Sequence, residues 1–185
     1  MKSVSLSVFY PHVMLPMIPE FLIDTVLVEV ADEFCRATRV ITEEQSALVT
    51  ANSTVVDIEV DSISVVRPFA VVSVEGLQSG DDWVQTGYNE VTLLKSKPEN
   101  RTLDYTVATR PVSGAAKLDE RLFEDWLRPI SKGTLARLRM MPGQNFNPDL
   151  AALNRQEYEM GVAEAKAHTI VGRNRSVLRT TPRPD

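Results

Sequence analysis

The residues of this chain that could take part in catalysis or bind a metal are few and lie far apart in the sequence. The two histidines, His12 and His168, stand near opposite ends, and no spacing typical of a zinc site connects them. The single cysteine, Cys35, has no histidine close to it in sequence that could activate it as a nucleophile. Asp81 and Asp82 could form a carboxylate pair, but they follow a serine and a glycine, which is typical of a solvated turn. The sequence therefore predicts no enzyme active site, no metal and no cofactor.

Charged side chains are distributed unevenly along the chain. Residues 1–114 hold 16 acidic and 8 basic residues, a net charge of −8, whereas residues 115–185 hold 9 acidic and 12 basic residues, a net charge of +3. This polarity predicts different neighbours at the two ends of the molecule. The candidate contact residues are four acids of the first half and three arginines of the second: Asp24, Glu29, Asp32, Glu33, Arg121, Arg128 and Arg137.

Residues 171–185 contain four arginines and show no helical period, which predicts a C-terminal arm. Three interpretations of this arm remain open. It is idle, it binds nucleic acid non-specifically through phosphates, or it becomes ordered when it docks on a protein partner. For docking, the arm supplies both apolar contact and positive charge through Arg173, Arg175, Val177, Leu178 and Arg179.

The elements that must position these residues follow from hydrophobic periodicity. Residues 20–39 predict a helix, because apolar residues from Ile23 to Phe34 recur at spacings of three and four. A second helix is expected at residues 119–141, in which Pro129 predicts a kink, or a break near Leu127–Arg128. A third helix is expected at residues 147–169, with Asn147 as its N-cap. From about 40 to 110 the period changes to two, which predicts four or five short antiparallel strands.

Composition places the chain among ordinary globular proteins. It has 185 residues, of which 43% are hydrophobic and 24% charged, and one cysteine cannot form an internal disulfide. No uncharged apolar run approaches the roughly 18–20 residues that span a bilayer. The N-terminus lacks the apolar stretch of a secretory signal, so we expect a cytoplasm-like compartment and no membrane.

Several short peptides occur in an order that resembles a known family. A lead-in at residues 8–13 reads Val-Phe-Tyr-Pro-His-Val, and an acidic helix ends in Glu-Phe-Cys-Arg-Ala-Thr-Arg at residues 33–39. After the β-rich stretch come Leu-Asp-Glu-Arg-Leu-Phe-Glu-Asp-Trp at 118–126, Gly-Thr-Leu-Ala-Arg-Leu at 133–138, and Met-Pro-Gly-Gln at 141–144. Asn147-Pro148 and a last helix through Tyr158, Gly161 and Ala165 follow. This order resembles the head-to-tail adaptor, or connector, proteins of tailed bacteriophages.

The resemblance implies an α+β fold in which an α-helical bundle of three to four helices carries a β-rich antiparallel insertion and an extended C-terminal arm. The helical core would comprise residues 1–40 and 115–170, the insertion residues 41–114 and the arm residues 171–185. The function implied is that of a structural virion protein. About twelve copies would form a homo-oligomeric ring beneath the portal protein and continue the DNA channel towards tail or neck proteins. The arm would dock on the portal, and the protein would be assembled in the host cytoplasm and reside in the neck of the virion.

The charged residues acquire a further interpretation from this resemblance. Acids that line a channel would let double-stranded DNA pass without adhering, and opposite charges on one subunit would complement the next subunit around a ring. Three alternatives stay open: another neck component, such as a stopper or tail-completion protein; a small nucleic-acid-binding module that uses the arginine arm; and an enzyme that uses Cys35, Asp81 or Asp82.

Overall fold

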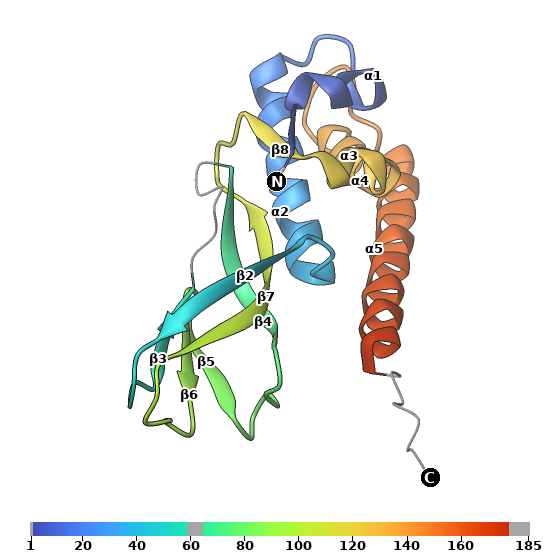
Figure 1. Ribbon diagram of the computed structural model, residues 1–185. Helices are drawn as coiled ribbons and strands as arrows, with labels where there is room; N and C mark the ends of the chain where they lie inside the picture. The colour runs from blue at the N-terminus through green and yellow to red at the C-terminus, as the bar shows by residue number, and fades with distance from the viewer. Residues whose placement is uncertain (1, 59–64, 178–185) are drawn as a thin grey trace.

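The computed structural model describes residues 2–58 and 65–177, and the side chains as far as residue 170. Figure 1 shows helices in the upper and right-hand parts of the molecule and most of the strands in the lower left. One helix, α2 (Glu20–Thr38), lies between the two parts. The other helical elements are η1 (Leu6–Phe9, a 3-10 turn), α1 (Tyr10–Val13), α3 (Glu120–Glu124), α4 (Leu127–Leu138) and α5 (Pro148–Val177).

The apolar face of α2 forms the centre of the first hydrophobic core. Ile23, Leu27 and Phe34 are fully buried, and α4 and α5 pack against them. The helix ends where Arg39 adopts a left-handed conformation, with φ of 55°, and donates its N–H to the carbonyl oxygen of Cys35 at 2.8 Å. The predicted helix at residues 20–39 is therefore confirmed to within one residue.

The strands form three antiparallel sheets within the described residues. One sheet has the order β2-β7-β4 and faces a second sheet with the order β3-β6-β5, and together they enclose the second hydrophobic core. The third sheet pairs β1 with β8 among the helices. The strands are β1 (Ser3–Ser5), β2 (Thr42–Val49), β3 (Val55–Asp57), β4 (Val66–Val74), β5 (Trp83–Gly87), β6 (Glu90–Leu93), β7 (Arg101–Pro111) and β8 (Lys117–Asp119).

The predicted architecture, a helical bundle that carries a β-rich insertion, is wrong. Over the residues that the model describes, the structure is mixed, with five α-helices, 41% of residues in helix, 29% in strand and three small antiparallel sheets. Strands also occur in the helical part, because Ser3–Ser5 pairs with Lys117–Asp119. Three-residue strands are too short to show an alternating pattern, so the sequence did not indicate this sheet.

The predicted extended arm from residue 171 is also wrong over its first seven residues. Helix α5 continues to Val177, so Arg173, Arg175 and Val177 belong to its last two turns. The low apolar content of this segment concealed the helix, because helical periodicity can be recognised only where apolar residues mark a buried face. Leu178 and Arg179 lie outside the described residues.

The three helices that follow β8 agree more closely with the prediction. The predicted break near residue 127 occurs at Asp125–Trp126, which separates α3 from α4. Pro129 then occupies the first turn of α4, where its missing N–H costs no helical hydrogen bond. The N-cap of α5 is confirmed, because the side-chain oxygen of Asn147 accepts a hydrogen bond from the N–H of Leu150 at 3.0 Å.

Two glycines allow α4 and α5 to approach closely. A Cβ atom on Gly133 would lie 2.7 Å from Val30 Cγ1 and 2.8 Å from Tyr158 Cδ2. A Cβ atom on Gly161 would overlap the Cβ of Pro129. Both contacts are with atoms close to a backbone or inside the core, so the neighbours cannot move aside freely.

The change Gly161→Ala should therefore destabilise the protein, although alanine is the better helix former by about 1 kcal/mol. Overpacking typically costs about 1–3 kcal/mol. After the gain in helix propensity is subtracted, we expect the free energy of unfolding in urea to fall by up to about 2 kcal/mol. In a Pro129→Gly background, which removes the opposing Cβ, the same change should cost less. A higher stability of Gly161→Ala in the otherwise unchanged chain would contradict the close packing of these helices.

Candidate functional site

Asp32 joins the helical part to the β-rich part. It lies on the solvent side of α2 and accepts hydrogen bonds from two guanidinium groups, those of Arg36 on the next turn and Arg110 on β7, each at 2.8 Å. The Arg110 side chain is only 10% exposed and that of Asp32 only 21%. A charged pair that is this well removed from water fixes the two elements relative to each other.

The neighbouring acids of α2 bind a helix instead of the sheet. Glu29 and Glu33 both accept from the guanidinium of Arg137 on α4, at 3.1 and 2.5 Å. Asp24 accepts a hydrogen bond of 2.9 Å from the hydroxyl of Tyr10. Burial and the nearby Asp24 carboxylate raise the pKa of Tyr10 to about 12, so its hydroxyl keeps the proton that it donates.

The remaining predicted arginines also have partners within the chain. Arg121 binds both carboxylate oxygens of Asp119, at 3.0 and 2.7 Å, and donates to the carbonyl oxygen of Thr42 at 3.0 Å. Arg128 donates to Glu157 on α5 at 3.1 Å. All seven charges proposed from the sequence as contact or channel residues thus interact with other residues of the same chain. The side chains of Glu29, Glu33 and Arg128 remain more than half exposed, so a neighbouring molecule can still reach them.

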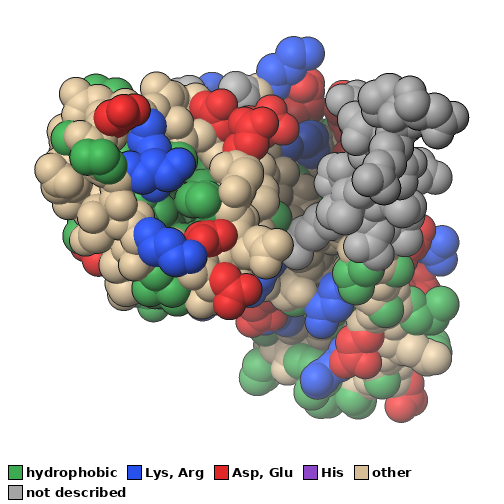
Figure 2. Space-filling model, turned by 60° about the horizontal axis from the view of Figure 1, so that its bottom comes forward, with side chains coloured by type: hydrophobic (Ala, Val, Ile, Leu, Met, Phe, Trp, Pro, Cys, Tyr) green, Lys and Arg blue, Asp and Glu red, His purple; other side chains and the backbone are tan. Residues whose placement is uncertain are grey.

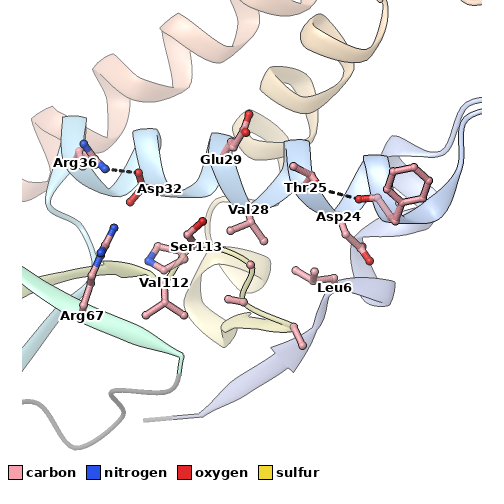
Figure 3. A pocket seen from close by; sticks show the side chains of 15 residues that line it. Leu6, Asp24, Thr25, Val28, Glu29, Asp32, Arg36, Arg67, Val112 and Ser113 are labelled. Atoms are coloured by element: carbon pink, nitrogen blue, oxygen red, sulfur yellow. Dashed lines mark hydrogen bonds and ion pairs between the residues drawn. The ribbon is translucent and has the colours of Figure 1, made fainter.

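A groove of about 580 Å³ runs along the same side of α2 (Figure 3). Asp24, Thr25, Val28 and Asp32 form one wall, and Leu6 and the connector after β7 form the other. Arg36 and Arg67 lie together at the end nearer the sheet. With its apolar floor and charged rim, this groove suits a protein side chain or a short segment better than a reacting small molecule. Four of its charged residues, Asp24, Glu29, Asp32 and Arg36, already have partners within the chain.

A second groove, of about 750 Å³, separates α2, α4 and the N-terminal half of α5. Its floor consists of small and apolar residues, including Gly133, Ala136 and Ala151, and its rim carries Glu33 and Arg155. Arg137, which ties α2 to α4, also lines it. The ion pairs of Arg137 with Glu29 and Glu33 therefore lie beside this groove.

The positions of Cys35, His12 and His168, which were considered for catalysis, do not favour a reaction. Cys35 is fully buried, and desolvation, with Asp119 and Asp32 nearby, raises the pKa of its thiol well above the usual range. A thiol in that state is a poor nucleophile. His12 and His168 are both exposed, and the ring of His168 lies edge-on to that of Trp126, with centroids 6.1 Å apart.

The paired aspartates occupy a turn, as expected. Asp82 accepts a hydrogen bond of 3.0 Å from the backbone N–H of Gln78, which is the main reason that the pKa of its carboxyl is lowered. Lys95 adds an ion pair at 3.5 Å. Over the described residues there is no group of three or more histidines, cysteines or acids that could hold a metal ion. No helix in this part of the chain is long and apolar enough to cross a bilayer.

One residue of these ion pairs, Arg110, was missed from the sequence, whereas Asp119 was expected as a helix N-cap but not as the partner of Arg121. Arg110 is a buried residue next to Pro111, at the end of β7. Asp119 is the N-cap of α3, and its carboxylate accepts a hydrogen bond from the N–H of Arg121 at 2.9 Å. The cap position of Asp119 was recognisable, but nothing local indicated that Arg110 would reach a carboxylate 78 residues earlier. Comparison of the sequence with protein-family models and with curated proteins finds no match.

Proposed function

We propose that this chain is a structural protein of a tailed-phage virion, a head-to-tail adaptor that forms a ring beneath the portal and offers a platform for tail attachment. The proposal starts from the resemblance in element order and short peptides. The geometry adds one supporting observation, the position of the basic C-terminal end of α5.

Helix α5 extends beyond the point where it is hydrogen-bonded to the end of α2. Thr169 donates a hydrogen bond of 3.2 Å to the carbonyl oxygen of Thr38, at the end of α2. The helix then continues to Val177, through a segment whose sequence includes Arg173 and Arg175. Figure 1 shows this end of the helix apart from the two sheets of the β-rich part. A helix end with a basic sequence suits docking on an acidic surface of a partner such as a portal ring.

The test is the native mass of the purified chain mixed with the portal protein encoded in the same genome. We expect about twelve copies of the chain to join one portal ring, as closed cyclic symmetry requires equivalent contacts. Deletion of residues 171–185 should abolish joining. Neutralising Arg173, Arg175 and Arg179 to alanine should weaken it, and more strongly at low salt than at high salt, because salt already screens the attraction of the unchanged chain.

A matched control neutralises three exposed lysines elsewhere, Lys95, Lys97 and Lys117, in the same way. This triple variant should join the portal as the unchanged chain does. The proposal fails if the folded chain does not associate with the portal, or if the truncated chain associates equally well.

A further inference from the structure

Three arginine side chains converge where the sheet β2-β7-β4 meets the C-terminal half of α2. Arg67 on β4 lies directly opposite Arg110 on β7, so the two side chains leave the same face of the sheet. Arg36 reaches the same place from α2, because Arg36 and Arg110 bind one carboxylate, that of Asp32. In Figure 3, Arg67 points from the sheet towards Asp32 and Arg36. Like charges directly opposite each other on paired strands repel, so a negative group beside them is stabilising.

The Asp32 carboxylate is fully occupied by two of these arginines. One of its oxygens accepts from Arg36 and the other from Arg110, each at 2.8 Å. Arg67 has no hydrogen-bond or ion-pair partner among the described residues. Three positive charges and one negative charge leave a local net charge of +2 at this place. On the surface shown in Figure 2, by contrast, basic and acidic side chains are interspersed.

The two remaining acids of the groove along α2 do not neutralise this excess. Glu29 is bound by Arg137 on α4 at 3.1 Å. Asp24 is bound by Tyr10, and it lies 12 residues before Arg36, about 18 Å along the helix. Of the charged side chains that line the groove, Arg67 is therefore the one that is available to a ligand.

A phosphate group fits the end of the groove at which these arginines lie. A phosphate monoester carries about two negative charges at neutral pH, which matches the local excess. Its three terminal oxygens accept hydrogen bonds from guanidinium groups that converge on one point. Beyond Arg36 and Arg67, the groove of about 580 Å³ has apolar walls that include Leu6, Val28 and Val112, where an organic group can lie.

We propose that this groove binds a small phosphate monoester. Arg67 and Arg36 donate hydrogen bonds to the phosphate group, and the organic group lies against Val28 and Val112. Arg110 adds positive charge without touching the ligand, because its side chain is only 10% exposed and is held by Asp32. The site needs neither a second copy of the chain nor a portal, so the inference is independent of the adaptor function.

Isothermal titration calorimetry of the 185-residue chain with phenyl phosphate, at constant ionic strength, tests the proposal. The unchanged chain should bind one phenyl phosphate. Arg67→Met should raise the dissociation constant by about tenfold or more, because a hydrogen bond between charged groups is lost. Arg101→Met is the matched control, because Arg101 begins β7 at the end away from Arg110 and does not line the groove. It should leave the affinity unchanged.

Two comparison ligands identify the chemical class. Inorganic phosphate lacks the organic group, and benzoate carries one negative charge in place of two, so both should bind more weakly than phenyl phosphate. The proposal is overturned by a dissociation constant for phenyl phosphate above about 10 mM, which is weaker than specific millimolar binding. Equal affinity of the Arg67→Met chain, or of inorganic phosphate or benzoate, overturns it as well.

Urea unfolding without any ligand separates binding from a structural role of Arg67. Arg67→Met should leave the free energy of unfolding unchanged or raise it, because the repulsion between Arg67 and Arg110 is removed. A lower free energy of unfolding would mean that Arg67 already binds an acid of the same chain, and this result would contradict the proposed site.

Discussion

Replacing Phe34 by alanine should lower the free energy of unfolding by about 3–5 kcal/mol, the usual cost of removing a fully buried phenylalanine. The Phe34 side chain has no exposed surface, and its ring centroid lies 5.6 Å from that of Trp126 and 6.4 Å from that of Tyr158. These two rings belong to different segments, the α3–α4 junction and α5. The cavity would therefore open where three segments meet, and it could not close by moving one of them.

Urea unfolding followed by far-ultraviolet circular dichroism measures this change. Phe146→Ala is the matched control, because Phe146 is 52% exposed in the loop between α4 and α5. It should alter the stability by no more than about 0.5 kcal/mol. A loss below about 1 kcal/mol for Phe34→Ala would mean that α5 does not close over the core at this point, because the cavity cost would then be missing.

The role of Phe34 illustrates what the sequence could predict. The 3.6-residue period of α2 identified its buried face, because a helix of 19 residues repeats its apolar pattern several times. The N-cap Asn147 was equally recognisable, since capping depends on neighbours in sequence. Such local rules explain why α2 and the start of α5 were placed correctly.

The errors occurred where local rules give no signal. Strand β2 is mostly polar and owes its place to pairing with β7, where Thr42 lies opposite Ala108 and Val49 opposite Arg101. The pair β1–β8 joins segments more than a hundred residues apart. Strand pairing of this kind depends on tertiary contacts that a single sequence does not display. The mixed architecture followed from these pairings.

In the candidate site, too, features that depend on neighbours in sequence were predicted and contacts between distant segments were not. The acids of α2 were identified as a charged face, but their partners were not, because Arg110 and Arg137 come from distant parts of the chain. Acids that were expected to line a channel or to contact a neighbouring subunit are bonded within the chain, to β7, α4 and Tyr10. Charge patterning therefore located the right residues without revealing that they act first within the fold.

Asp32→Ala should lower the free energy of unfolding by about 3 kcal/mol, because it would leave the Arg110 guanidinium buried without its carboxylate. The Nε of Arg110 is already buried without a hydrogen-bond partner among the described residues, so this side chain depends on the 2.8 Å contact with Asp32. Asp32→Asn keeps an oxygen acceptor but loses the charge, and should cost less than Asp32→Ala. Asp81→Ala removes an exposed carboxylate and serves as the control, with an expected change within about 0.5 kcal/mol.

A double-mutant cycle measures the interaction energy between Asp32 and Arg110 separately from their other contacts. If the cost of Asp32→Ala arises from the stranded Arg110, then Asp32→Ala combined with Arg110→Met should be less destabilising than the sum of the two single changes. Methionine fills the space of the arginine stem without its charge, and buried ion pairs are often replaceable by apolar residues at little cost. Additive effects would instead mean that Asp32 stabilises the fold mainly through Arg36. Since Arg36 is half exposed, that contribution should be no more than about 1 kcal/mol, so a large additive loss would contradict the assigned role of Arg110.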